Sequence, residues 1–432
     1  MGETAPVSRY AIPAERLHGS VFDDRLLSMV FLNEIMARFP EAISFAPGAP
    51  HESLFEGVDV GRCVDRYAAY LRENGLSPDG VRSRLYQYGP SRGLVNDLVA
   101  EAVRRDERID VGPDAVLLTV GAQEAIFLLL RVLHEAATDA VAVVEPTYPG
   151  LLGAARLLGL PVVGLGDDGA GPDPADLREL YQRTLKAGRR IRTLYLCPDF
   201  ANPSGTQLSL ERRKALLAEA DRLDLLIIED TAYRFTAAPG SAPPSMKALD
   251  DVGRVVQVGS FAKIAVPGAR TGYLIADQRT DTGTTLAEHL ATAKAALTIN
   301  TAPIAQAVAG GLLLEHGGSI AELGRAKGEL YRGNLRHLLA ALRLHIGPPE
   351  GNAAGVRWNE PAGGFFVQMT LPIPADDALL YRSAREFGVL WTPMRAFYLG
   401  DDGEFRLRLS CSSLNPPQID EGVVRLAKAL SL

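Results

Sequence analysis

Cysteine, tryptophan and histidine are scarce in this chain. Of 432 residues, 3 are cysteine, 2 are tryptophan and 7 are histidine. Cys63, Cys197 and Cys411 are widely separated and follow no C-x-x-C spacing, so they indicate neither a disulfide framework nor a thiolate metal site. The histidines follow no metal-ligand spacing either, and we expect no metal centre. Unpaired buried thiols are typical of a reducing compartment, which predicts a cytoplasmic protein.

The sequence also lacks a long apolar run and an excess of positive charge. No uninterrupted apolar stretch approaches the roughly 18 residues that a membrane-spanning helix needs, and the first residues carry no apolar signal core. The net charge is −7, and the 45 Lys and Arg residues are dispersed. This balance disfavours nucleic acid as a partner. A length of 432 residues with 47% hydrophobic residues predicts a globular protein of two domains.

The middle of the chain alternates between short apolar runs and amphipathic stretches. The runs include AVAVVEP, TLYLCPDF, LLIIEDTAY and VVQVGSF, and their continuous apolar character is typical of parallel strands buried on both faces. We therefore expect an α/β fold, with helices on both sides of a mostly parallel sheet. Helices are also predicted over residues 24–39 and 91–105. The predicted division is an N-terminal arm and helix over 1–50 that packs with the small domain, a large domain over 51–309, and a small α+β domain over 310–432.

Polar residues follow the ends of several predicted strands. Ligands of open α/β sheets bind beyond the carboxyl ends of the strands, so these side chains are expected to share one crevice. They offer an anion site at the start of a helix, a flat aromatic face, one fixed negative charge and an amine. An anionic, aromatic ligand that carries an aldehyde would use all of them. The strand-end segments are Gly121-Ala122-Gln123, Thr147-Tyr148, Asn202-Pro203-Ser204-Gly205, Asp230-Thr231-Ala232-Tyr233 and Ser260-Phe261-Ala262-Lys263.

Each of these residues, taken alone, has an ordinary structural explanation. Asn202 begins a good turn sequence, Asp230 could cap a helix, and a lysine such as Lys263 is usually a surface charge. It is the ordered set that favours a ligand site. Residues 164–169 match G-x-G-x-x-G, but Gly171, Pro172 and Pro174 follow instead of a helix start, so a turn is favoured over a nicotinamide-dinucleotide site.

The order of these motifs resembles a known family. Asn-Pro-x-Gly, then Asp-x-x-Tyr, then Ser-x-x-Lys with Arg270 seven residues after Lys263 resembles the fold type I pyridoxal 5'-phosphate enzymes, specifically the class I/II aminotransferases of the kynurenine/α-aminoadipate aminotransferase-like subgroup. The resemblance extends from SFAPGAP to RLRLSCSS. It implies a large domain with a mostly parallel seven-stranded sheet, a smaller α+β C-terminal domain, pyridoxal 5'-phosphate as cofactor, and a homodimer with shared active sites.

The resemblance also assigns roles to individual residues. It implies that Lys263 forms an aldimine with the cofactor and moves the substrate's Cα proton, and that Asp230 pairs with the pyridinium nitrogen. Arg408, preferred over Arg406, would bind the substrate carboxylate, and Tyr88 would reach the neighbouring subunit's phosphate. Cofactor contacts are further implied for Gly121, Ala122, Gln123, Tyr148 (by ring stacking), Asn202, Tyr233, Ser260 and Arg270, and substrate contacts for Gly48 and Asn202.

The chain departs from the family pattern in places that bear on specificity. Ala122 and Ala262 stand where hydroxyl residues are common, and the N-terminal arm lacks the arginine motif of well-known members. The predicted function is transfer of an amino group from an α-amino acid to a 2-oxo acid. A pyridoxal phosphate-dependent lyase, or an oxidative or decarboxylating deaminase, acting on a specialised amino acid or an S-cysteinyl-type substrate, stays as the alternative. A transcription factor that carries this fold is disfavoured because it requires an added basic domain.

Overall fold

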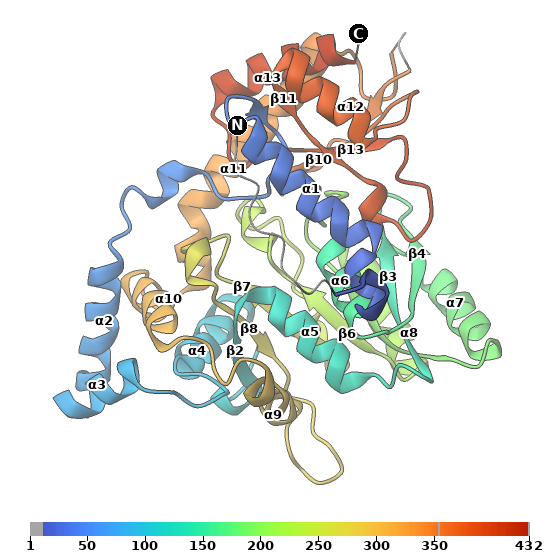
Figure 1. The fold of residues 1–432 in the computed structure, drawn as a ribbon. Coiled ribbons are helices and arrows are strands. Elements are labelled where there is room, and N and C mark those ends of the chain that lie inside the picture. Colours follow the sequence, from blue (N-terminus) through green and yellow to red (C-terminus); the bar gives the residue numbers. More distant parts are fainter. Residues whose placement is uncertain (1–11, 353–354, 431–432) are drawn as a thin grey trace.

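A seven-stranded sheet forms the centre of the computed structural model, which describes residues 12–352 and 355–430. The strand order is β2-β8-β7-β6-β5-β3-β4 (Figure 1). Strands β3 to β7 run parallel, and β8 is antiparallel to both of its neighbours. This confirms the predicted α/β sheet. The strands are β2 (Val116–Thr119), β3 (Asp139–Glu145), β4 (Val162–Gly166), β5 (Arg190–Leu196), β6 (Leu226–Asp230), β7 (Val255–Ser260) and β8 (Gly272–Ile275).

Helices cover both faces of this sheet because its strands are apolar on both sides. Along β3, Val141 and Val143 pack with one group of helices, and Ala142 between them packs with the other group. The first group comprises α5 (Gly121–Leu133), α6 (Pro149–Leu157) and α9 (Leu286–Leu297). The second comprises α7 (Pro174–Lys186) and α8 (Leu210–Arg222). A further core beside β2 and β8 includes α2 (Val60–Glu73), α3 (Pro78–Tyr86), α4 (Asn96–Glu107) and α10 (Pro303–Glu315).

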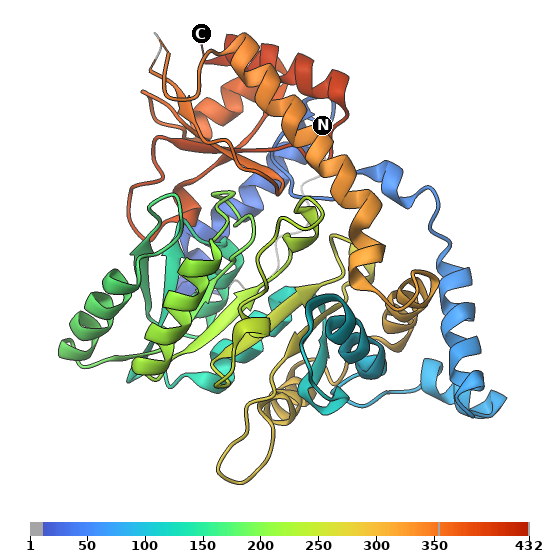
Figure 2. The same cartoon turned by 180° about the vertical axis from the view of Figure 1, so that it is seen from behind.

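The C-terminal part builds a second, antiparallel sheet of four strands in the order β12-β13-β10-β9. The long helix α11 (Ile320–His345) runs from α10 up to this sheet (Figure 2). The strands are β9 (Arg357–Trp358), β10 (Phe366–Thr370), β12 (Thr392–Pro393) and β13 (Arg406–Ser410), and the covering helices are α12 (Asp377–Arg382) and α13 (Pro416–Ala429). The smaller antiparallel sheet beside the large one agrees with the predicted fold type.

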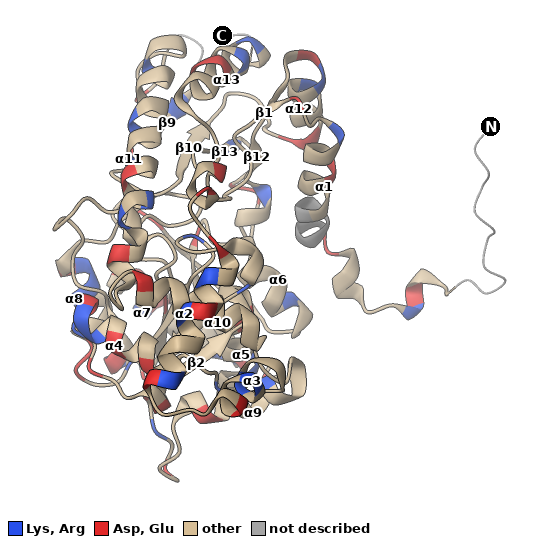
Figure 3. Cartoon of the chain, turned by 90° about the vertical axis from the view of Figure 1, so that its left-hand side faces the viewer, with Lys and Arg blue, Asp and Glu red and all other residues tan. Residues whose placement is uncertain are grey.

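The N-terminal segment packs against this C-terminal part. Helix α1 (Asp24–Arg38) contributes Ile35 to its core, and β1 (Ile43–Ser44) pairs in parallel with β11 (Val389–Leu390). The domain limits stay a prediction, and residue 310 lies inside α10. Charged residues of both signs are interspersed over the described elements (Figure 3). No helix of the described residues combines the length and the apolar composition that crossing a bilayer requires.

The helix predicted over residues 91–105 was placed too early, because α4 begins at Asn96. Gly93 has a φ of +124°, and a Cβ there would lie 2.7 Å from Leu118 Cβ, so this stretch follows a close turn against β2. The G-x-G-x-x-G stretch was predicted as a turn, but residues 164–166 are the end of β4 and only 167–169 are irregular; no helix opens there, since α7 begins at Pro174. Asp173 caps α7 after it by accepting a hydrogen bond from Ala175 N.

Candidate active site

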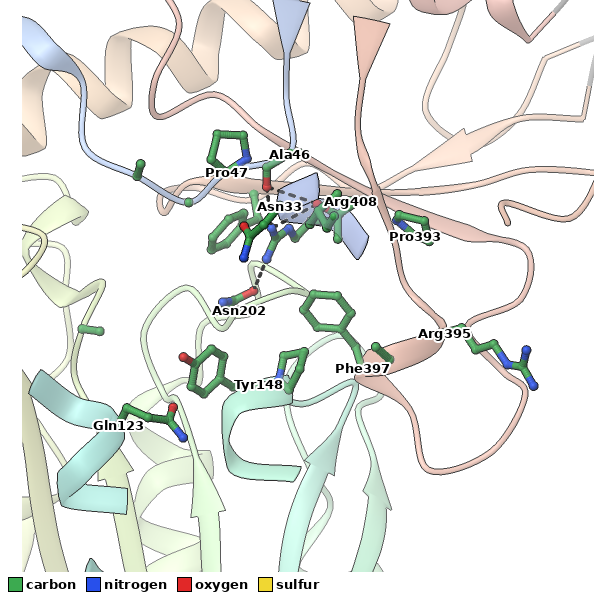
Figure 4. A pocket seen from close by; sticks show the side chains of 18 of the residues that line it. Asn33, Ala46, Pro47, Gln123, Tyr148, Asn202, Pro393, Arg395, Phe397 and Arg408 are labelled. Atoms are coloured by element: carbon green, nitrogen blue, oxygen red, sulfur yellow. Dashed lines mark hydrogen bonds between the residues drawn. The ribbon is translucent and has the colours of Figure 1, made fainter. Parts of the chain in front are cut away.

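A cavity of about 1610 Å³ lies between the carboxyl ends of the parallel strands and the C-terminal sheet. Most of the predicted site residues line it, although they come from segments far apart in the chain (Figure 4). Gly121 is not itself a lining residue, but it directly precedes Ala122, which is. The predicted residues among the lining are Gly48, Ala122, Gln123, Tyr148, Asn202, Asp230, Tyr233, Ser260, Lys263, Arg270 and Arg408.

Lys263 follows β7 and presents its amine to the cavity. Its Nζ donates a hydrogen bond of 2.5 Å to the carbonyl oxygen of Gly48. Burial, together with the positive charges of Arg408 and Arg270, lowers the pKa of Lys263 to about 8. The neutral amine is therefore far more populated near neutral pH than in an exposed lysine, which suits a nucleophile and a proton carrier.

Asp230 ends β6 and is buried, with its carboxylate held by two neutral donors. Oδ2 accepts a hydrogen bond of 2.8 Å from the Tyr195 hydroxyl, and Oδ1 accepts one of 3.0 Å from Ala232 N. Burial raises the pKa of Asp230, while these hydrogen bonds act in the opposite direction. Such a carboxylate is suited to pair with a cationic group of a ligand. Tyr195 was not among the predicted site residues, because it lies inside the apolar strand β5.

The start of α5, the end of β7 and Arg270 come together as a cradle for an anion. Gly121 has a φ of +73°, and a Cβ at this position would lie 2.6 Å from Arg270 Nη2. A Cβ at Gly272 would likewise lie 2.9 Å from Ala122 N. The free N–H groups of a helix start and a guanidinium are the usual partners of a phosphate. Ser260 also lines the cavity, and it pairs with Gly272 across β7 and β8.

Two neighbours of this cradle have other partners. Gln123 Nε2 donates to Gly150 O at 2.7 Å, so its side chain braces the start of α6. Glu124 in the first turn of α5 is buried and accepts hydrogen bonds from Lys294 Nζ at 2.5 Å and from Thr298 Oγ1 at 2.6 Å. The Lys294 charge thus offsets a carboxylate that would otherwise oppose an anion at this helix start. Sequence reasoning had no signal for this pair.

Arg408 lies on β13 and extends into the cavity between aromatic rings. Its Nη1 donates to Asn202 Oδ1 at 2.8 Å, and its Nη2 donates to Ala46 O at 2.7 Å. Burial lowers the pKa of Arg408 to about 10, and its Nε is buried without a hydrogen-bond partner among the described residues. The guanidinium lies 4.3 Å from the ring centre of Phe366. This arrangement is suited to bind a carboxylate.

Arg406 is placed differently, two residues earlier on the same strand. Its guanidinium lies 5.6 Å from the ring centre of Tyr398, and it is absent from the lining of the cavity.

Asn202 and Tyr233 form one edge of the cavity. Asn202 Nδ2 donates to the Tyr233 hydroxyl at 3.4 Å, and burial raises the pKa of Tyr233. Tyr88 is not part of this cavity. It is 82% exposed on the loop after α3, so a single chain does not bring it to the predicted site.

Residues 76–426 match the family model of class I and II aminotransferases. The chain is 43% identical over 419 residues to (S)-3,5-dihydroxyphenylglycine transaminase of Amycolatopsis orientalis, which covers 96% of this chain and 94% of that protein. Two solved structures share the fold. Pyrococcus horikoshii kynurenine aminotransferase has a TM-score of 0.78 at 26% identity, covering 98% of this chain and 97% of that one. Thermus thermophilus α-aminoadipate aminotransferase, complexed with N-(5'-phosphopyridoxyl)-L-leucine, has a TM-score of 0.76 at 30% identity, covering 96% and 98%.

The residues of the cavity fit pyridoxal phosphate. The cradle at Gly121 matches a phosphate, the buried carboxylate of Asp230 matches a protonated ring nitrogen, and the amine of Lys263 matches an aldehyde. The predicted family and cofactor are thereby confirmed, and transamination is the reaction of the chain. The chain belongs to the class I and II aminotransferases, close to the kynurenine/aminoadipate aminotransferases and the dihydroxyphenylglycine transaminase, and its cofactor is pyridoxal phosphate.

Proposed function

We propose that this aminotransferase acts on an aromatic α-amino acid of the arylglycine type whose ring carries hydroxyl groups. The observation that carries the proposal is a substrate-side wall rich in carboxylates and aromatic rings. The Amycolatopsis relative, an (S)-3,5-dihydroxyphenylglycine transaminase that is 43% identical over nearly the whole chain, supports the same substrate class.

The proposed roles of the site residues follow from their positions. Pyridoxal phosphate, when bound, withdraws electrons from the substrate's Cα and so makes its proton acidic. Lys263 moves that proton, and Asp230 keeps the ring nitrogen protonated. Arg408 binds the substrate's α-carboxylate. The cradle would hold the cofactor's phosphate through Arg270, Ser260, Gly121 and the backbone N–H of Ala122. Tyr148 would stack on the cofactor ring. Asn202 and Tyr233 would form hydrogen bonds with the oxygen on that ring.

The lining residues that are not assigned to the cofactor or to the α-carboxylate would disfavour a substrate with an acidic side chain. Their carboxylates include Asp376 and Asp377. Burial together with the charge of Asp376 raises the pKa of Asp377, and the charge of Arg395 acts in the opposite direction. Besides Arg270 and Arg408, the lining contains Arg395, whose side chain extends away from Tyr148 and Arg408 (Figure 4). A second substrate carboxylate would meet like charges, whereas phenolic hydroxyls would donate to them. The other acidic and aromatic lining residues are Asp23, Glu52, Asp401, Glu404, Phe31, Phe55, Phe366 and Phe397.

A panel of amino donors tests this proposal. We expect the kcat/KM for 3,5-dihydroxyphenylglycine to exceed that for α-aminoadipate by at least about tenfold, equivalent to ~1.4 kcal/mol. Phenylglycine, which has the same ring without the hydroxyl groups, is the control substrate for the contribution of those hydroxyls. Asp377→Asn should raise the relative rate with α-aminoadipate. A preference for α-aminoadipate or aspartate in the native enzyme would contradict the proposal.

We further propose that a second copy of the chain completes the site. Tyr86 and Tyr88 are 75% and 82% exposed, and Leu297, Ile299 and Ile304 are also exposed. The loop after α3 lies against α10 and the segment before it, because Leu94 N donates to Gln306 Oε1 at 2.7 Å and a Cβ at Gly89 would lie 3.5 Å from Asn300 Nδ2. Large apolar side chains gathered on a surface are typical of a protein interface. A homodimer would cover them and bring Tyr88 to the partner's phosphate cradle.

Tyr88→Phe tests the shared site because it removes only a hydroxyl. Loss of one hydrogen bond to a charged group predicts cofactor affinity roughly 10- to 100-fold weaker, measured by equilibrium dialysis. Tyr86→Phe, on the same exposed surface, is the control and should keep native affinity. Sedimentation velocity should give a dimer for both variants. Unchanged affinity in Tyr88→Phe, or a monomeric native enzyme, would count against the shared site.

A further inference from the structure

A buried ion pair holds the loop that carries Asn202, one of the residues that line the cavity. Arg213 of α8 and Asp199, which follows β5, have fully buried side chains, and Arg213 Nη2 lies 2.5 Å from Asp199 Oδ1. The guanidinium of Arg213 also donates through Nε to Leu208 O at 3.1 Å, through Nη2 to Pro198 O at 3.1 Å, and through Nη1 to Pro244 O at 3.2 Å. Pro198 and Leu208 are the two ends of the loop that carries Asn202, so Arg213 holds the loop at both ends.

Asp199 joins this loop to a second one. Besides Arg213, it accepts hydrogen bonds from Arg234 Nη1 at 2.7 Å and from Gln207 Nε2 at 3.0 Å. Arg234 is the residue after Tyr233 and lies in the turn that follows β6. The carboxylate of Asp199 therefore contacts one arginine from α8 and one from the turn that carries Tyr233. Burial acts to raise the pKa of Asp199, but the attraction of both arginines outweighs it and holds this pKa below its usual range.

The loop between Pro198 and Leu208 has an unusual backbone that needs outside support. Phe200 has a φ of +57°, in a region that non-glycine residues seldom occupy. Inside the loop, Ala201 N donates to Thr206 O at 3.0 Å and Gly205 N donates to Ala201 O at 2.7 Å. Asn202 lies in this loop, and its Nδ2 lies 3.4 Å from the Tyr233 hydroxyl of the other loop. The distance between Asn202 and Tyr233 thus depends on how the two loops are fixed to each other.

We propose that Asp199, Arg213 and Arg234 are positioning residues that set Asn202 and Tyr233 relative to the cofactor ring. The proposal rests on the proposed roles of Asn202 and Tyr233 toward the ring oxygen. A buried ion pair is weak evidence for stability, because apolar residues of similar volume often stabilise a protein equally well. Its directional contacts, in contrast, fix geometry. Here every N–H of the Arg213 guanidinium has an acceptor, and all of the acceptors except Pro244 O belong to the segment from Pro198 to Leu208 that carries Asn202.

Arg234→Gln separates the two loops while leaving the Arg213–Asp199 pair intact. We expect cofactor affinity to fall roughly tenfold to a hundredfold, as for other residues that orient a ligand's direct partners. We also expect the pH midpoint of the bound cofactor's visible absorbance to shift by about one unit, because hydrogen bonds to the ring oxygen change its protonation equilibrium. Arg234→Lys should restore part of both effects, since it keeps a charge near Asp199.

Arg178→Gln is the matched control. Arg178 forms an ion pair of 2.8 Å with the buried Glu219 of α8, but it contacts neither loop. We expect this variant to keep native cofactor affinity and absorbance. Asp199→Asn is a stronger change, and its thermal unfolding should be followed in the cofactor-free protein. If it does not fold, Arg234→Gln and Arg234→Lys carry the test.

Combined variants distinguish a failure of the proposed roles of Asn202 and Tyr233 from a failure of the positioning inference. If Asn202→Ala and Tyr233→Phe leave the absorbance midpoint at its native value, the proposed roles of these residues fail. If they shift it and Arg234→Gln does not, the positioning inference fails. The inference predicts that Arg234→Gln adds little to the shift already present in the Asn202→Ala, Tyr233→Phe double variant. Full additivity would overturn it.

Discussion

Lys263→Ala is expected to lower kcat by roughly 10²- to 10⁴-fold, because the variant loses the group proposed to carry the Cα proton. Lys263 is the amine that lines the cavity, and it contacts Gly48 O at 2.5 Å. Steady-state turnover with an aromatic donor and a 2-oxo acid measures the loss. Rapid mixing of amino acid with the loaded enzyme then shows whether the first half of the reaction has stopped.

Lys214→Ala is the control, since Lys214 is exposed on α8. It should keep native turnover, cofactor content and thermal stability. Near-native turnover in Lys263→Ala with bound cofactor would refute the role of this amine.

Arg408→Lys is expected to reduce kcat/KM by roughly 10²- to 10³-fold, equivalent to about 3–4 kcal/mol. The planar guanidinium donates to Asn202 and Ala46 at once, and it presents a fork that matches a carboxylate. A lysine ammonium keeps the charge but loses this fixed geometry. Competitive inhibition by a carboxylate analogue of the substrate should weaken in parallel, which distinguishes binding from proton transfer.

Arg406→Lys makes the same chemical change two residues away on β13. Because Arg406 lies over Tyr398 rather than in the lining of the cavity, we expect less than about a twofold effect, as for most surface substitutions. Equal losses in both variants would argue against the selection of Arg408.

The strand-end residues of the site could be predicted because sheet geometry gathers them. Asp230, Ser260 and Lys263 stand at the carboxyl ends of β6 and β7, where a polar residue after an apolar run is visible in the sequence. The residue order then identified the family. The roles themselves stay predictions for the variants above to test.

Other residues of the site gave no signal in the sequence. Tyr195 lies within an apolar strand, where it is indistinguishable from a core residue until its hydroxyl is seen 2.8 Å from Asp230. Arg213 lies in a helix rich in charge, where a surface position would be expected, yet its side chain is fully buried. Lys294 pairs with Glu124, 170 positions away in the sequence. Such contacts depend on tertiary packing, and no local pattern encodes them.

The closeness of Arg408 to Lys263 couples proton uptake to ligand binding. The positive charge of Arg408 is one cause of the lowered pKa of the Lys263 amine. A carboxylate bound at Arg408 cancels much of that charge, so a free amine at Lys263 then holds its proton more firmly. Thermodynamic linkage makes this reciprocal, and protonation of Lys263 strengthens the binding of the carboxylate by the same factor. If a substrate binds its carboxylate at Arg408 as proposed, that group would therefore act as an effector of the Lys263 amine.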